Sequence, residues 1–142
     1  MASLNPYLNF NGNTEEVFNF YKSVFGGEFA TIMRFKDMPP EHKTPESENN
    51  KIMHIALPIG KGNMLMGSDV PDAYPKATPG SNFYISVSAE GEEEARKLFK
   101  GLSEGGKVMM PLEKSFWGAL FGMFADKFGV SWMVSYDYNR QQ

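Results

Sequence analysis

The stretch from Phe116 to Tyr136, FWGALFGMFADKFGVSWMVSY, decides the fold that we predict for this chain. Two runs rich in aromatic and β-branched residues flank the turn sequence DKFG at positions 126–129. Gly129 suits a backbone position with positive φ, and Asp126 can accept hydrogen bonds from the backbone amides just ahead of it. The stretch therefore predicts two antiparallel strands joined by a tight turn.

The second run alternates between two faces, as a strand with one buried side does. One face is apolar and is predicted to face the core: Val130, Trp132, Val134 and Tyr136. The other face combines small polar groups with one thioether, as the wall of a ligand pocket can: Ser131, Met133 and Ser135.

The composition of the 142 residues indicates one soluble globular domain with a substantial core, because 42% are hydrophobic and 22% charged. The formal net charge of -3 argues against binding to nucleic acid, which needs a basic patch. We find no apolar run long enough to span a bilayer and no signal-peptide pattern in MASLNPYLNF, and we expect no membrane partner. The absence of cysteine excludes disulfides and thiolate metal sites, and it fits a cytoplasmic location.

The chain is rich in methionine, with 10 residues, and in aromatic residues, at 14%. Two interpretations stay open. These side chains fill a core, which is the commoner case for any single residue, or they line a soft and adaptable ligand cavity.

The first half begins with a predicted strand at 7–10, a turn at 11–13 and a helix at 14–25. Asn13 and Glu16 have the spacing of a capping box at the start of this helix. Gly26 and Gly27 are expected to end it. A second strand is predicted at 28–35.

The polar segment 37–50, DMPPEHKTPESENN, has no apolar periodicity and three prolines. It predicts a long loop and a candidate lid over a site. Strands are predicted at 51–59 and 64–68, joined by a turn at 60–63. The proline-rich stretch 70–80 is predicted to connect two halves of the chain.

The second half repeats the order of the first. We predict a strand at 82–87, a helix within 90–104, a strand at 107–112, and then the two strands described first. Each half thus predicts strand, helix and three strands, which indicates two fused βαβββ units: unit one at about 1–69, the connector at 70–80 and unit two at 81–138. The predicted class is α+β.

The chain resembles the PhnB-like branch of the vicinal-oxygen-chelate superfamily, the relatives of glyoxalase and of bleomycin-resistance proteins. The resemblance is carried by FYKSVFGGEF after the first strand and DKFGVSW near the end, and by PYLNFNGNTEEVFNFYKSVFGGEF, KIMHIALPIGKGNMLMGSDV, SNFYISV and FWGALFGMFADKFGVSW. It covers nearly the whole chain. It implies a single vicinal-oxygen-chelate domain over 1–142, in which each βαβββ unit wraps a curved sheet around a cavity, and a homodimer.

Function follows less directly from the resemblance, because one fold hosts many chemistries. Some relatives are metal-dependent isomerases, lyases, dioxygenases or thiol transferases, and others sequester drugs without a metal. The branch has also been given a methyltransferase label. The sequence offers no glycine-rich nucleotide loop after a strand to support that label.

In metal-using relatives, four strands each place one side chain in the cavity. The resemblance puts these positions at Tyr7, Met66, Asn82 and Met133. A phenol, two thioethers and one amide suit a hard divalent ion poorly, and His54 and Asn9 add no carboxylate. We therefore expect no stoichiometric zinc, iron, nickel or manganese there, and no other cofactor.

His54 is the only histidine in a predicted strand. Its alternation with Ile52 and Ala56 indicates a position facing the cavity. Two interpretations stay open: a structural histidine held by a hydrogen bond, which is the commoner case, or a proton donor or ligand anchor. By contrast, Asp69 and Asp126 stand at strand ends, where turn formation is expected rather than catalysis.

Two functions remain from this sequence, beside a third possibility, a dimeric scaffold whose cavity is filled by its own Met and Phe side chains. The first is a protein that binds a small organic molecule in a metal-free cavity, and the second is a divalent-metal-dependent isomerase, lyase or dioxygenase of the glyoxalase type. Catalytic residues cannot be named. The predicted ligand-binding residues are Tyr7, Asn9, His54, Met66, Asn82, Tyr84, Trp117, Met133 and Ser135. In the strand at 82–87, Asn82, Tyr84 and Ser86 are predicted to face the cavity and Phe83, Ile85 and Val87 the helix.

Overall fold

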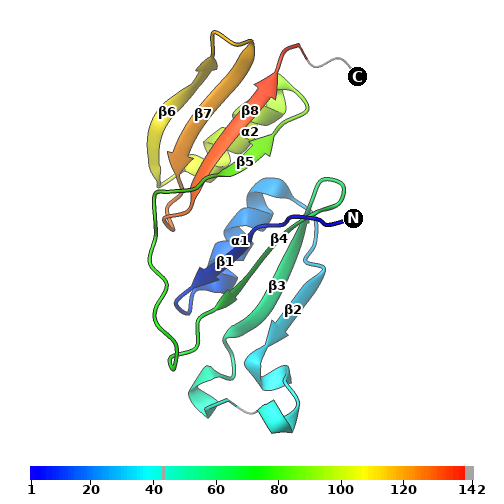
Figure 1. Ribbon diagram of the computed structural model, residues 1–142, viewed down its shortest axis with the longest axis vertical. Coiled ribbons are helices and arrows are strands. Elements are labelled where there is room, and N and C mark those ends of the chain that lie inside the picture. Colours follow the sequence, from blue (N-terminus) through cyan, green and yellow to red (C-terminus); the bar gives the residue numbers. More distant parts are fainter. Residues whose placement is uncertain (43, 140–142) are drawn as a thin grey trace. The chain divides into compact units, whose positions relative to one another are not determined.

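A computed structural model describes residues 1–42 and 44–139. The chain forms two compact units, Met1–Thr78 and Pro79–Gln142. Each unit contains one helix and one four-stranded sheet, and Figure 1 shows these elements. The predicted α+β class with two βαβββ units is confirmed.

The first unit has the strand order β1-β4-β3-β2, in which β1 and β4 are parallel and the other neighbours are antiparallel. Its elements are β1 (Tyr7–Phe10), α1 (Thr14–Phe25), β2 (Thr31–Arg34), β3 (Ile52–Ile59) and β4 (Asn63–Asp69). Three short 3-10 helices lie between β2 and β3: η1 (Phe35–Asp37), η2 (Pro40–His42) and η3 (Glu46–Glu48).

The second unit repeats this topology with the order β5-β8-β7-β6, and β5 is parallel to β8. Its elements are β5 (Ile85–Ser88), α2 (Glu92–Ser103), β6 (Lys107–Lys114), β7 (Ala119–Ala125) and β8 (Ser131–Asp137). In Figure 1, β8 crosses in front of α2, which covers the far side of its sheet.

In both units the helix packs on one face of the sheet, and we call the other side the open face. In the first unit the buried side chains Leu8 and Phe10 alternate with Tyr7 and Asn9, and Val17 and Phe18 of α1 are buried as well. Gly67 lies on the helix side too. A Cβ added there would meet the Leu8 carbonyl oxygen at 2.8 Å and Phe18 at 2.8 Å, so this contact requires glycine.

The second unit has the same arrangement. Trp132 and Val134 of β8 are buried beneath α2, and Phe99 of α2 meets Phe124 of β7 edge to face at 5.0 Å between ring centroids. The turn 126–129 holds Gly129 at φ 90°, as its sequence predicts. Asp126 accepts hydrogen bonds from the backbone N–H groups of Phe128 and Val130, which confirms the predicted turn.

Three details differ from the sequence-based expectations. The strands predicted at 28–35 and 82–87 are shorter, covering only Thr31–Arg34 and Ile85–Ser88. The Asn13 side chain makes no capping hydrogen bond to α1, because Asp69 at the end of β4 supplies the acceptor instead. Phe83 does not pack beneath α2. It is 57% exposed because the chain is not yet part of the sheet at this position.

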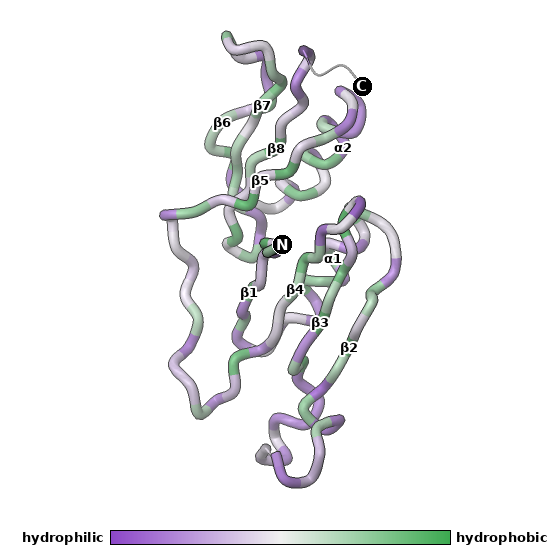
Figure 2. Tube along the Cα trace, turned by 45° about the vertical axis from the view of Figure 1, so that its right-hand side comes forward, coloured by the Kyte–Doolittle hydropathy of each residue, from purple (hydrophilic) through white to green (hydrophobic). Residues whose placement is uncertain are grey.

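The segment 37–50 contains η2 and η3 rather than continuous loop, and Figure 2 shows much of it in hydrophilic colours. The connector after β4 is bonded to the first unit at two places. Asn11 exchanges two side-chain hydrogen bonds with the backbone of Ala77, at 2.8 and 2.9 Å, and Asp72 is held near the start of β3. The connector up to Ala77 is therefore part of the first unit.

Candidate functional site

The open face of the first sheet holds most of the predicted first-unit site. Strand register places Tyr7 beside Met66, Asn9 beside Ser68 and Met33 beside His54. None of the side chains that the four strands turn toward this face carries a full formal charge when His54 is neutral: Tyr7, Asn9, Thr31, Met33, His54, Ala56, Pro58, Met64, Met66 and Ser68. The face is therefore a mixture of thioethers and neutral polar groups.

Tyr7 and His54 form a pair across this face. The Tyr7 hydroxyl lies 3.2 Å from His54 Nδ1, and the two rings stack with centroids 5.7 Å apart at 26°. When His54 is neutral and the phenol donates to Nδ1, the ring carries its proton on Nε2. His54 can then donate from Nε2 to a ligand oxygen, with its ring orientation fixed by Tyr7. The hydrogen bond to Tyr7 is compatible with a structural histidine. It is equally compatible with a ligand anchor, because it would hold the imidazole in a fixed orientation toward a ligand.

A second polar pair lies two residues further along β1 and joins β1 to β4. Asn9 Oδ1 accepts a hydrogen bond from Ser68 Oγ at 3.3 Å, which leaves the Asn9 amide NH₂ group as a donor. Ser68 was not among the residues predicted from the sequence. Its signal was its alternation with Met66 in the strand.

The second sheet brings together some of its predicted residues. Met133 is paired with Ser86, and both stand opposite the face that carries Trp132 and Val87. Ser135 follows on the same face. Asn82 is exposed and precedes β5, so it is not paired with Met133. By register, Ser86 stands beside Met133 as Tyr7 stands beside Met66 in the first unit.

Tyr84 and Trp117 lie at opposite ends of the second unit's strands. The Tyr84 hydroxyl donates a hydrogen bond to Met109 Sδ at 3.5 Å. Tyr84 directly precedes the edge strand β5 and Met109 lies on the other edge strand, β6, so this bond links the two edges of the sheet. Trp117, in the turn before β7, packs edge to face on Phe121 at 5.5 Å. Phe121 is paired with Ser135, so the indole borders the open face.

The donor set does not fit the divalent metal ion that this fold holds in some of its members. Tyr7 offers a phenol that is already hydrogen-bonded to His54, and Met66 beside it offers a thioether. Met133 offers a second thioether, beside the hydroxyl of Ser86. In a chain without cysteine thiolates, zinc, iron and manganese sites require several nitrogen or anionic oxygen donors. Among residues 1–42 and 44–139, no group of three or more His, Asp or Glu side chains is placed to hold a metal.

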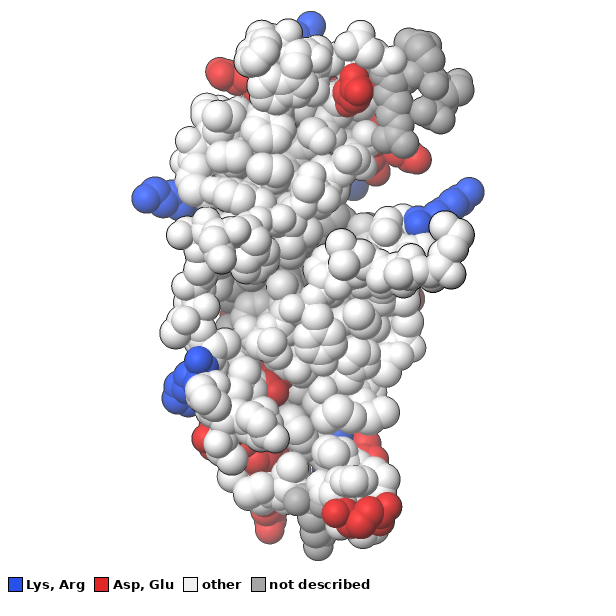
Figure 3. All heavy atoms as spheres, viewed as in Figure 1, with Lys and Arg blue, Asp and Glu red and all other residues white. Residues whose placement is uncertain are grey.

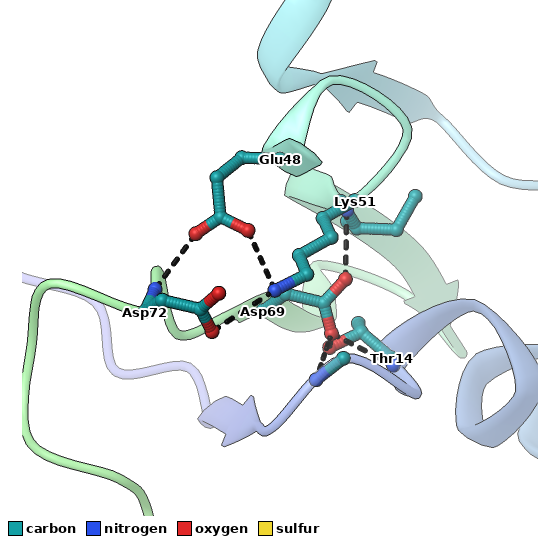
Figure 4. Close-up of polar contacts among 7 residues, drawn as sticks. Thr14, Glu48, Lys51, Asp69 and Asp72 are labelled. Atoms are coloured by element: carbon teal, nitrogen blue, oxygen red, sulfur yellow. Dashed lines mark hydrogen bonds and ion pairs between the residues drawn. The ribbon is translucent and has the colours of Figure 1, made fainter. Parts of the chain in front are cut away.

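A separate polar cluster lies at the base of the 37–50 segment, and Figure 4 shows it from close by. Glu48 is only 2% exposed, although the surrounding sequence is polar. Its Oε2 lies 2.6 Å from Lys51 Nζ, and its Oε1 accepts the backbone N–H of Asp72 at 2.7 Å. Lys51 also contacts Asp72 at 3.3 Å. No local pattern in the sequence indicates this cluster, which ties the segment to the connector.

The ionisation of this cluster is shifted by its contacts. The ion pair with Lys51, and then the Asp72 N–H, hold the pKa of Glu48 below its ordinary 4.5. The same Glu48 contact, followed by Asp72, raises the pKa of Lys51 above 10.5. The carboxylate therefore contributes stability that is present above pH 4.5 and is lost as pH falls through its lowered pKa. The Lys51 contribution is present below pH 10.5 and is lost as pH rises through its raised pKa.

We predict that Glu48→Gln lowers the urea midpoint of unfolding at pH 7, and that the difference from the original protein shrinks as pH falls toward 3. The glutamine side chain does not ionise, so the variant lacks the loss of stability at acid pH that protonation of Glu48 causes in the original protein. Glu46→Gln, in the same short helix, is the control. Parallel pH profiles for the original protein and Glu48→Gln would show that the ion pair does not govern this dependence.

Comparison with known proteins identifies the family. The sequence model of the Glyoxalase/Bleomycin resistance protein/Dioxygenase superfamily matches residues 3–134 of this chain. The chain belongs to this superfamily. It is 32% identical over 139 residues to Protein YjdN of Escherichia coli strain K12, covering 93% of both chains. Within the superfamily it is a PhnB-like protein, as the sequence resemblance predicted.

Two solved structures support this assignment. Protein PA1353 from Pseudomonas aeruginosa is 41% identical with a TM-score of 0.85, over 96% of this chain and 98% of that one. A Bacillus cereus PhnB protein, described as a putative 3-demethylubiquinone-9 3-methyltransferase, is 29% identical with a TM-score of 0.71, over 95% of this chain and 99% of that one.

No helix in the part of this PhnB-like chain that the structure describes is long and apolar enough to cross a membrane.

Proposed function

We propose that this PhnB-like protein binds a small organic molecule on the open faces of its curved sheets, without a divalent metal at the positions its superfamily uses. The observation that carries the proposal is the first open face. It holds two oriented neutral polar pairs, Tyr7–His54 and Asn9–Ser68, among thioethers. Small-ligand sites commonly combine a largely apolar surface with a few fixed polar groups.

The donors and acceptors on this face suit a ligand that carries an oxygen acceptor. His54 Nε2 and the Asn9 amide are available to donate, and the Tyr7 ring provides a flat surface beside them. A metal-dependent isomerase, lyase or dioxygenase would need carboxylates or further imidazoles that these positions lack. The PhnB-like relatives support the fold rather than a reaction, so catalysis is not part of the proposal.

Native mass spectrometry of the freshly purified protein tests ligand binding. Under native conditions we expect a mass larger than that of the chain by the mass of a bound molecule. Under denaturing conditions we expect the mass of the chain alone. Tyr7→Phe and His54→Ala should reduce the bound fraction, with affinity falling about two- to tenfold for a lost neutral hydrogen bond. Tyr74→Phe and His42→Ala, outside the site, are the matched controls. Equal retention in all four variants would contradict a site at Tyr7 and His54.

Elemental analysis after growth with added metals tests the second part of the proposal. We expect far less than one equivalent of zinc, iron, nickel or manganese per chain. About one equivalent, lost in the double variant of Asn82→Ala and His54→Ala, would favour the metal-dependent enzyme.

We further propose a cytoplasmic homodimer. The support is the absence of cysteine and the exposed aromatic residues of the β6–β7 hairpin, where Phe116 is 98% exposed. Sedimentation across a wide concentration range measures the oligomeric state, and a strictly monomeric chain would contradict the dimer.

A further inference from the structure

The open face of the second sheet carries a row of methionines. Strand register places Met110 beside Met123, Met123 beside Met133, and Met133 beside Ser86. The row therefore crosses all four strands, β6, β7, β8 and β5, and three consecutive positions in it are thioethers. Direct cross-strand neighbours have Cβ atoms about 4.5 to 5.5 Å apart, so these side chains are immediate neighbours on the face.

A β-bulge adds a fourth thioether to this row. The register between β6 and β7 shifts between Val108 and Met110, so Met109 is an extra residue on β6. Its sulfur accepts the Tyr84 hydroxyl at 3.5 Å, and Tyr84 precedes the first residue of β5 on the edge opposite β6. Met109 and Met110 are 43% and 44% exposed. The four methionines are thus a surface and not part of the packed core.

Aromatic rings border the row on one side. Phe121, two residues before Met123, packs on Trp117 at 5.5 Å, and Trp117 packs on Phe116 at 5.1 Å. Both contacts are edge to face. Ser135 stands beside Phe121 and supplies a hydroxyl.

Full charges lie at the margins of this surface. Lys107 and Asp137 stand at strand ends, and Glu113 lies on the edge strand opposite Phe121. Figure 3, seen from the side on which β8 lies in front of α2, shows charged side chains of this unit mainly toward its outline. No charged residue lies in the methionine row of the four described strands. A charged group bound over its centre would therefore lack a counter-ion.

We propose that this methionine row binds a flat, uncharged aromatic ring system, which defines the class of ligand for the function proposed above and rests on that proposal. Thioether sulfur makes favourable contacts with aromatic rings, and flexible methionines adapt to the ring outline. Three neighbouring strands span roughly 10 Å, and adjacent rows on one face are about 7 Å apart, which matches a fused two- or three-ring compound. Tyr84 and Ser86 can bond to a hydroxyl or carbonyl on its edge.

Two probes of similar outline separate aromatic recognition from general hydrophobic binding. The aromatic probe is 2-naphthol and the saturated probe is decahydro-2-naphthol. In protein with ¹³C-labelled methionine methyl groups, 2-naphthol should shift the signals of Met109, Met110, Met123 and Met133 through its ring current. The double variant of Met123→Leu and Met133→Leu keeps the apolar volume and loses the sulfurs. It should bind 2-naphthol roughly five- to tenfold more weakly and the saturated probe within about twofold.

The double variant of Met38→Leu and Met53→Leu, in the first unit, is the matched control and should bind 2-naphthol as the original protein does. Equal losses for both probes would overturn aromatic recognition, and so would methyl shifts confined to Met33 and Met66 or no shift at all. None of these results affects the mass-spectrometric test of a bound molecule at Tyr7 and His54. The inference and the proposed function can therefore fail separately.

Discussion

Replacing Asp69 with alanine is expected to lower the free energy of unfolding of the first unit by about 3 to 5 kcal/mol. Asp69 is 3% exposed. Its Oδ1 accepts the N–H of Gly12 at 3.0 Å, the N–H of Thr14 at 3.0 Å and the Thr14 hydroxyl at 2.6 Å. Its Oδ2 accepts the N–H of Ile52 at 2.8 Å. One carboxylate thus caps α1 and joins it to β3 and β4 (Figure 4).

The effect is large because alanine would leave several donors buried without an acceptor, and a buried donor without a partner costs about 1 to 3 kcal/mol. Urea unfolding followed by circular dichroism measures the change. Asp37→Ala is the control: Asp37 Oδ2 accepts the Arg34 N–H in an exposed position, so its replacement should cost less than about 1 kcal/mol. Similar midpoints for the two variants would show that Asp69 does not hold these elements together.

Replacing Asp126 with alanine is expected to destabilise the second unit by about 3 kcal/mol. Asp126 is buried at the turn between β7 and β8. Its Oδ1 accepts the N–H groups of Phe128 and Val130 at 2.9 and 3.0 Å, and its Oδ2 accepts Trp132 Nε1–H at 2.9 Å. Trp132 is among the largest buried side chains, so the carboxylate couples the turn to the core beneath α2.

Near-ultraviolet circular dichroism and indole fluorescence measure this prediction, because the loss of the indole hydrogen bond should alter both before global unfolding. Asp137→Ala is the matched control in the same unit. Asp137 accepts the Asn139 N–H at 2.9 Å in an exposed turn. If Asp126→Ala leaves the spectrum of Trp132 and the stability unchanged, the turn is held by its backbone alone.

These two aspartates also bear on function. Both were expected to form turns, and the structure gives both a scaffold role, with Asp69 capping a helix in addition. Both carboxylates are bonded to backbone amides next to the ends of strands, where they serve the scaffold. The open face of the first sheet and the methionine row of the second carry neutral groups, which agrees with the proposed binding of an uncharged organic molecule.

Local patterns in the sequence were enough to predict the order of the helices and strands. Helical spacing predicted α1 at 14–25, and alternation with a DKFG turn predicted the last two strands, because these signals are local and depend only on periodicity and turn chemistry. The repeated order of the two halves then identified two βαβββ units. Alternation also separated the faces of β8 correctly, with Trp132 and Val134 buried.

Which residues meet across strands and between elements is known from the three-dimensional structure and not from local patterns. The cap of α1 comes from Asp69, 55 residues beyond Thr14, and no local pattern at Asn13 could indicate it. Glu48 is buried in a polar segment because Lys51 and Asp72 meet it there. A register shift at the β6 bulge adds Met109 to the methionine row, and strand pairing sets Ser86 rather than Asn82 beside Met133. Pairing and bulges are set by hydrogen bonds between distant segments, so one sequence leaves them undetermined.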